Sequence, residues 1–214
     1  MYVMSVNVGR THLLQTGSGT RQTGIYKELV QGAVEITAEG IVGDAVCDTR
    51  HHGGVDQAVY VYGAVDYEWW GRTLGQELHP GTFGENLTIA DFESSKTSIG
   101  DRFHIGNAVL EVTAPRIPCG TLARRMNDRE FVTRFREAER PGVYCRVIEP
   151  GNVRAGDDVV LKPYPGETVS VIEVFRVFYA SDVDRETLQC HLAAPIAIRD
   201  RIAKQRQLER CTSL

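Results

Sequence analysis

The sequence contains few cysteines, and none of them forms a closely spaced pair. The five cysteines, at positions 47, 119, 145, 190 and 211, include no Cys-x-x-Cys motif. An odd number at irregular spacing argues against a disulfide framework, and also against a cysteine-rich zinc or iron–sulfur site. Each cysteine is therefore judged alone, and four of them are expected to have no special chemistry.

The sequence also lacks long apolar runs and an excess of positive charge. No apolar run approaches the roughly 18 residues of a membrane span. Residues 1–11 lack the charged, apolar and cleavage regions of a signal peptide, so we expect a cytoplasmic protein with no membrane contact. The 24 Lys and Arg against 28 Asp and Glu give a net charge of −4, which argues against a generally basic nucleic-acid binder.

The pattern of short strands in the sequence predicts a mainly β fold of the α+β class. The chain has 214 residues, enough to bury a core without disulfides. Short strands separated by Gly-containing turns are typical of a sandwich or closed barrel, so we expect a closed, mostly antiparallel β-barrel with peripheral helices. The predicted strands are 2–8, 33–37, 58–62, 86–89, 103–105, 109–112, 143–148 and 158–161. Gly106-Asn107 favours a tight hairpin turn between the fifth and sixth of them.

Helical spacing of apolar residues predicts helices at 64–74 and 121–139, the second divided at Asn127-Asp128 with Asp128 as an N-cap. After the linker 163–166, helical periodicity begins at residue 171, although the composition of 169–178 also suits a strand. A short helix after Asp184 and a longer one near Pro195 should follow. We therefore predict a barrel domain at 1–164 and a small helical extension at 165–214.

Charge is unevenly distributed along the chain. Segment 35–101 carries 12 acidic and 3 basic residues, whereas segment 116–140 carries 7 arginines and 4 acids. An anionic ligand should be attracted to the second segment. The alternative is a solvated helix face with i,i+4 ion pairs.

Two Gly-containing motifs combine backbone freedom with polar side chains. The motif His51-His52-Gly53-Gly54-x-Asp56 offers a titrating ring and a carboxylate beside glycines that permit a close ligand approach. In Phe83-Gly84-Glu85-Asn86, an acid and an amide lead into a strand, a rigid arrangement suited to recognising a heterocycle edge. A polar turn and an Asx-type loop are the corresponding structural alternatives.

The segment Pro115-Arg116-Ile117-Pro118-Cys119 is the most informative. Its prolines hold Arg116 in an extended segment, and Cys119 precedes a predicted helix. Nearby arginines and helix-start amides favour the thiolate, which is a nucleophile or a soft metal ligand. A purely structural cysteine is the alternative.

Two further candidates carry weaker signals. Residues 16–20 (TGSGT) lack the Lys and the following helix of a P-loop, so we expect a flexible loop there. Lys27 is a candidate for anion contact, with a solvated lysine as the alternative.

Together these segments resemble the MOSC domain family, named for the C-terminal region of molybdenum cofactor sulfurase, and within it the compact YiiM-like bacterial members with a C-terminal three-helix extension. The matching stretches are Thr23-Gly24-Ile25-x-Lys27, Gly43-Asp44, His52-Gly53-Gly54-x-Asp56-x-Ala58-Val59, the aromatic patch 67–70, Phe83-Gly84-Glu85-Asn86-Leu87, Ile99-Gly100-Asp101-x-Phe103-x-Ile105-Gly106, Pro115-Arg116-x-Pro118-Cys119 and Ala155-Gly156-Asp157. They cover most of residues 23–161 in the family's order, whereas the tail after Pro165 is matched only loosely.

The resemblance implies a β-barrel that binds the molybdenum cofactor, a phosphorylated pyranopterin whose dithiolene sulfurs hold molybdenum. The metal-binding cysteine of the family corresponds to Cys119. Around it, the resemblance places Arg116, Lys27, the loop of His52, Gly53, Gly54 and Asp56, and the pair Glu85 and Asn86. Cys145, in a predicted strand, departs from the expected positions and is interpreted as a core cysteine.

The activity that the resemblance implies is reduction of N-hydroxylated small molecules such as hydroxylaminopurines, amidoximes or hydroxylamines. His52 is the proton-donor candidate, because its reference pKa lies near neutrality. With no flavin, haem or iron–sulfur motif, the electrons should come from a separate reductase. Two alternatives remain open: a non-catalytic carrier of the cofactor, and a cysteine hydrolase that uses Cys119 as nucleophile and His52 as base.

Overall fold

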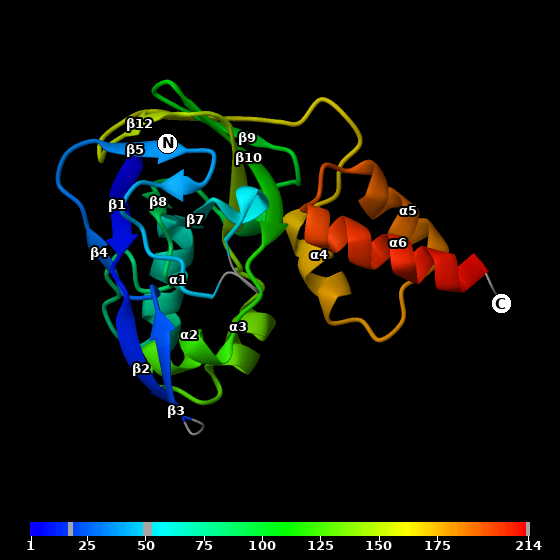
Figure 1. The fold of residues 1–214 in the computed structure, drawn as a ribbon, viewed down its shortest axis with the longest axis horizontal. Helices are drawn as coiled ribbons and strands as arrows, with labels where there is room; N and C mark the ends of the chain where they lie inside the picture. The colour runs from blue at the N-terminus through cyan, green and yellow to red at the C-terminus, as the bar shows by residue number, and fades with distance from the viewer. Residues whose placement is uncertain (17–18, 49–52, 213–214) are drawn as a thin grey trace.

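Eight strands form one curved, mixed sheet at the centre of the computed structural model, which describes residues 1–16, 19–48 and 53–212 (Figure 1). In spatial order the strands are β13 (Val159–Lys162), β9 (Arg102–Ile105), β10 (Ala108–Pro115), β11 (Val143–Glu149), β7 (Val59–Gly63), β8 (Leu87–Ile89), β1 (Val3–Gly9) and β4 (Lys27–Leu29). All neighbours are antiparallel except β7 and β8. The chain is thus of the α+β class, with a large, mostly antiparallel sheet.

The prediction of a closed barrel was wrong. Strands β13 and β4 are the edges of the sheet, and no continuous ladder between described residues joins them. Within the described ranges, the start of β1 meets the turn before β13 through the isolated bridge Tyr2–Asp158. Val3 N–H donates to Asp157 O there (2.9 Å), and Val159 N–H donates to Met1 O (3.0 Å). The sheet therefore curls toward closure but leaves both edge strands incompletely paired.

Two smaller sheets flank the main one. The first has the order β12 (Gly151–Val153), β5 (Val34–Thr37), β6 (Gly40–Ile41), and the second is the hairpin of β2 (His12–Thr16) and β3 (Gly19–Thr23). All eight predicted strands are present. The loop predicted at 16–20 was wrong, because Thr16, Gly19 and Thr20 belong to the hairpin strands, while residues 17–18 lie outside the described part. This exposed hairpin is held by backbone pairing and has little apolar periodicity to reveal it.

Six α-helices surround the sheets within the described ranges: α1 (Ala64–Leu74), α2 (Gly120–Arg125), α3 (Phe131–Ala138), α4 (Val171–Phe178), α5 (Arg185–Ala193) and α6 (Ile198–Thr212). The predicted break at Asn127-Asp128 separates α2 from α3. Asp128 is not the N-cap of α3, which is Glu130; instead its carboxylate accepts the Glu130 N–H (2.9 Å) and stabilises the preceding turn. Asp184 caps α5 by accepting the Thr187 N–H (2.8 Å). No helix in the described ranges is long and apolar enough to cross a membrane.

Helix α4 packs into the same apolar core as the main sheet. Its residues Val171 and Val174 belong to the cluster that contains Phe103 and Val112. Helices α5 and α6 continue outward from α4 (Figure 1). The second core cluster is aromatic and lies among the main sheet, α1 and α3; it includes Tyr62, Trp70, Phe83, Phe131 and Phe135. The division of the chain after residue 164 stays a prediction.

Asp56 ties α6 to the main sheet. Its Oδ2 accepts the Ile198 N–H at the start of α6 (2.7 Å), and its Oδ1 lies 3.1 Å from Arg146 Nε on β11. Arg146 in turn donates to the carbonyls of Pro195 and Ile196 (3.0 and 3.3 Å). Asp56, in the short 3-10 helix Val55–Gln57 that precedes β7, therefore anchors the helical tail.

Replacing Asp56 with alanine should destabilise the protein by about 2–3 kcal/mol, because a half-buried charged hydrogen bond is lost and Arg146 loses its nearest carboxylate. For a chain of this length, that corresponds to a melting temperature lower by roughly 4–12 °C. Calorimetry of Asp56→Ala beside Asp182→Asn, an exposed carboxylate with no such contact, checks it. Equal melting temperatures for the two variants would contradict the anchoring role.

Candidate functional site

Two adjoining chambers lie between the main sheet, α2 and the C-terminal helices. The outer chamber has a volume of about 780 Å³ and is lined from β3, β10, β11, α2, α4 and α6. The inner chamber, of about 100 Å³, lies against β3, β4, β7 and the loop 44–48. Residues common to both linings are Arg21, Asp48, Gln57, Cys119, Thr121 and Tyr144. A ligand in one chamber would therefore be in contact with groups that also face the other.

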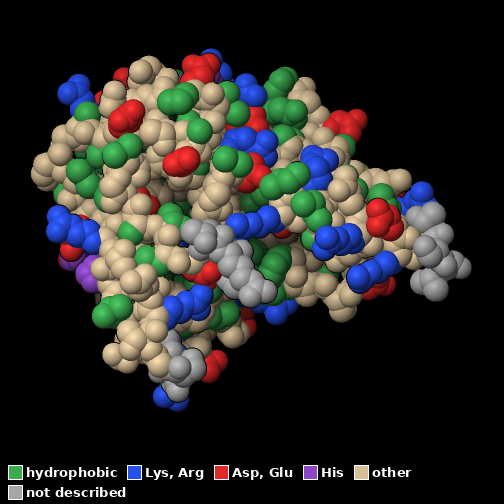
Figure 2. Space-filling view, in the orientation of Figure 1, with side chains coloured by type: hydrophobic (Ala, Val, Ile, Leu, Met, Phe, Trp, Pro, Cys, Tyr) green, Lys and Arg blue, Asp and Glu red, His purple; other side chains and the backbone are tan. Residues whose placement is uncertain are grey.

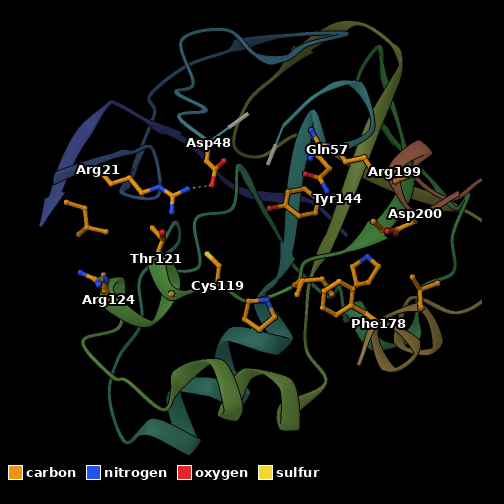
Figure 3. Close-up of a pocket in the computed structure, with 18 of the residues that line it drawn as sticks. Arg21, Asp48, Gln57, Cys119, Thr121, Arg124, Tyr144, Phe178, Arg199 and Asp200 are labelled. Atoms are coloured by element: carbon orange, nitrogen blue, oxygen red, sulfur yellow. Dashed lines mark hydrogen bonds and ion pairs between the residues drawn. The ribbon is translucent and has the colours of Figure 1, made fainter. Parts of the chain in front are cut away.

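Cys119 lies at the junction of the two chambers (Figure 3). It follows Pro118 at the start of α2, where it is the N-cap residue with an extended backbone (φ −134°, ψ 168°). Its carbonyl accepts the N–H groups of Leu122 and Ala123 (3.0 and 3.2 Å), while its side chain makes no capping bond. The half-buried sulfur is thus directed at the chambers by a backbone that the helix start holds in place.

Arg116 places a buried cation against the inner chamber. Its side chain is only 4% exposed, its guanidinium lies 5.0 Å from the centre of the Tyr60 ring, and Nη1 donates to Phe83 O (2.9 Å). No carboxylate of the described residues pairs with it, and its buried Nε has no hydrogen-bond partner among them. Burial acts against the charge, but Tyr144, Tyr60 and Cys119 favour it, so the pKa of Arg116 is raised. A permanent charge with unused donor capacity is available here.

Lys27 also faces the inner chamber, but its charge is already balanced. The ammonium pairs with both oxygens of Asp44, at 2.5 Å from Oδ2. Asp44 Oδ2 also accepts from Asn86 Nδ2 (2.9 Å), and Asn86 Oδ1 accepts the Tyr60 N–H (3.0 Å). Burial lowers the pKa of Lys27, partly offset by Asp44. Lys27 and Asn86 therefore line the inner chamber within a network that leaves less positive charge for a ligand than Arg116 does.

Glu85 is fully buried and lines neither chamber. Its Oε1 accepts from Tyr67 OH (2.7 Å), Gly81 N–H (2.6 Å) and Thr88 Oγ1 (2.8 Å). Burial raises the pKa of this carboxyl group, against the lowering effect of those donors. The contacts hold together the turn whose Phe83 carbonyl binds Arg116, so Glu85 supports the site from behind.

Comparison with known proteins identifies the family of this chain. The MOSC domain profile matches residues 48–160, slightly more than half of the chain. The chain belongs to the MOSC domain family. The matched range contains Arg116 and Cys119, whereas Arg21, Lys27 and the helices α4 to α6 lie outside it. The MOSC match therefore includes the wall of the chambers that carries Cys119.

Three similar proteins match this chain beyond residues 48–160. YflK of Bacillus subtilis is 36% identical over 177 residues, covering 83% of this chain and 80% of that protein. A protein named "Reductase" from Gibberella moniliformis is 32% identical over 87% of this chain but only 34% of its own length. The crystal structure of YiiM from Geobacillus stearothermophilus superposes with a TM-score of 0.80 at 22% identity, covering 97% and 98% of the two chains. At that identity the superposition establishes the shared fold alone.

The residues of the motif His51-His52-Gly53-Gly54-x-Asp56 contribute unequally to the site. His52, the predicted proton donor, lies outside the described residues, so its role stays a prediction. Gly53 lines the inner chamber with φ 74°, and a Cβ there would lie 2.7 Å from Val46 Cγ1. Gly54, with φ 82°, and Asp56 line neither chamber. The motif thus combines a chamber-lining glycine with the Asp56 anchor, one residue before Gln57, which faces both chambers.

The residues present fit the cofactor that MOSC membership implies. The orphaned Arg116 Nε can donate to an anionic oxygen, and Cys119 offers sulfur to a thiophilic metal. The inner chamber admits only a small group, whereas the outer one is in the size range of small-molecule sites, about 300–1,000 Å³. Of the two chambers, the outer one has the room for a heterocycle. Among the described residues, no group of three or more His, Cys, Asp or Glu side chains is placed to hold a metal ion.

Several lining residues were missed from the sequence. Arg21 comes from the hairpin, where it pairs with Asp48; Phe178 comes from α4; Arg199, Asp200 and Lys204 come from α6 (Figure 3). None belongs to a recognisable motif, since only the packing of distant segments brings them beside Cys119. Figure 2 shows Lys and Arg side chains on both sides of the boundary between the sheets and the C-terminal helices.

Proposed function

We propose that this MOSC protein binds the molybdenum cofactor through Cys119 and reduces N-hydroxylated small molecules to the corresponding amines or amidines. The observation that carries the proposal is the position of Cys119, whose sulfur faces a chamber large enough for a heterocycle and interacts electrostatically with the buried guanidinium of Arg116, which forms no ion pair with a carboxylate of the described residues. The name of the fungal relative, "Reductase", supports a redox activity.

The residues of this chain would hold and orient the reacting groups. Cys119 would bind the metal, and Arg116 would bind an anionic group at the inner chamber. When bound, the cofactor supplies two-electron redox chemistry at the metal. Cleaving the N–O bond of a hydroxylamine consumes two electrons and two protons, and releases the amine and water. A separate reductase would supply the electrons, and His52 is the proposed proton donor.

The deciding experiment uses holoprotein from a cofactor-competent host. Molybdenum and pterin are measured per chain, and the protein is then given reduced methyl viologen and 6-hydroxylaminopurine under anaerobic conditions. We expect adenine to form, with an initial rate proportional to molybdenum occupancy, and to be absent with protein lacking the cofactor. Full occupancy without turnover would refute the reductase proposal and favour a carrier.

A further inference from the structure

One wall of the outer chamber carries two unpaired charged groups on α6. Asp200 and Lys204 lie four residues apart, one helical turn, and both line the chamber that Cys119 lines (Figure 3 labels Asp200). Lys204 is only 8% exposed, and Asp200 is half-buried. Neither makes a hydrogen bond or ion pair with any residue in the described ranges, including each other. A lysine buried to this extent normally has a partner.

The surroundings of these groups do not neutralise them. Burial is the largest influence on both: it raises the pKa of Asp200, against the attraction of Lys204 and His191, and it lowers the pKa of Lys204, against the attraction of Asp200. His191, behind them on α5, is fully buried and directs Nε2 to Glu173 (3.3 Å). The ammonium and the carboxylate are open to the chamber, and neither has a hydrogen-bond partner in the described ranges, so both have hydrogen-bonding capacity that a ligand can use.

The ligand must satisfy a donor and an acceptor at one edge and present an apolar face. An ammonium only donates, and a carboxylate only accepts. Phe178, 57% exposed on α4, lines the same chamber and offers a ring face on which a planar group can stack. These three groups differ from the sulfur and guanidinium at the other side of the site.

We infer that this α6 wall binds the edge of a planar nitrogen heterocycle, with N–H groups donating to Asp200 and an adjacent ring nitrogen or carbonyl oxygen accepting from Lys204. This inference rests on the proposed function. A heterocycle edge of this kind then has two sources in the chamber: the base of a hydroxylaminopurine-type substrate, and the pterin of the cofactor. Both combine such donors and acceptors in a flat ring system, and they are distinguished by experiment.

The test compares Lys204→Met and Asp200→Asn with Arg206→Gln, an exposed cation on the same helix. All are purified as holoprotein. Pterin is counted per chain, and the affinity for 6-hydroxylaminopurine is measured by calorimetry without reductant, so that no turnover occurs. We expect both variants to lose about tenfold or more in the same readout, either pterin content or affinity for 6-hydroxylaminopurine, because each substitution removes a charge-assisted hydrogen bond. Lys204→Met should melt at or above the parent temperature, since an uncompensated buried charge is removed.

Weaker purine affinity with unchanged pterin content identifies the wall as a substrate site. Reduced pterin content identifies it as a cofactor site. If both variants match Arg206→Gln in both readouts, the inference is overturned. Because neither readout requires turnover, a holoprotein that binds 6-hydroxylaminopurine but does not reduce it would refute the proposed reaction and leave the α6 site standing.

Discussion

Replacing Cys119 with serine is expected to abolish N–O reduction and remove most of the bound molybdenum while leaving the fold intact. A serine hydroxyl is a hard, protonated group at neutral pH, whereas a thiolate is the ligand that a soft metal site selects. The side chain is half-buried and makes no capping bond, so the free energy of unfolding should change by less than about 1 kcal/mol. Elemental analysis, activity per chain and calorimetry measure the three effects.

The chain provides two matched controls for this experiment. Cys47 lines the inner chamber but not the outer one, and Cys190 is exposed on α5. Cys47→Ser and Cys190→Ser should both keep their molybdenum. A Cys119→Ser protein with normal metal content, or a Cys47→Ser protein without metal, would assign the ligand elsewhere.

Replacing Arg116 with methionine should weaken cofactor retention by about 10- to 150-fold, the equivalent of a charged hydrogen bond worth about 1.5–3 kcal/mol. Methionine fills a similar space but cannot bind an anion. In cofactor-free protein the melting temperature should stay within a few degrees of the parent, because removing an unpaired buried charge offsets the lost bond to Phe83. Pterin and molybdenum content after dialysis at moderate salt measure retention.

Arg125 is the appropriate control for that variant. It is also partly buried, lies 4.9 Å from the Tyr26 ring centre, and has an unpartnered Nε within the described part of the chain, yet it lines neither chamber. Arg125→Met should therefore retain the cofactor normally. If Arg116→Met and Arg125→Met retain equal amounts, the anion contact lies on other residues.

Local patterns predicted the elements whose stability is local. The strand predicted at 58–62 and the helix predicted at 64–74 are confirmed as β7 and α1, because the spacing of apolar residues along each segment determines which of its faces are buried. The hairpin containing Arg21 was missed because its residues are mostly polar and exposed. Closure of the sheet was predicted incorrectly, since it depends on how its two ends meet rather than on any strand.

The sequence predicted the side of the site that carries Cys119 and Arg116, but not the side formed by α6. The prolines and arginines around Cys119 mark that segment in the sequence itself, and the structure places Arg116 in the lining of the inner chamber. Glu85 and Asp56 belong to the two Gly-containing motifs of the sequence. Their carboxylates do not face the chambers, because Glu85 binds Tyr67 and Asp56 binds the start of α6. Asp200 and Lys204 carried no signal, because a charged pair one turn apart is ordinary on a solvated helix, and only tertiary packing buries it.

The anchoring of α6 by Asp56 has a thermodynamic corollary. Since α6 supplies part of the wall around any occupant of the outer chamber, release of the helix and release of the occupant are linked equilibria. A saturating occupant stabilises the docked tail by RT ln(1 + [L]/Kd), about 2.7 kcal/mol at one hundred times Kd. We therefore expect protease cleavage within 198–212 to become slower as occupancy of the outer chamber rises.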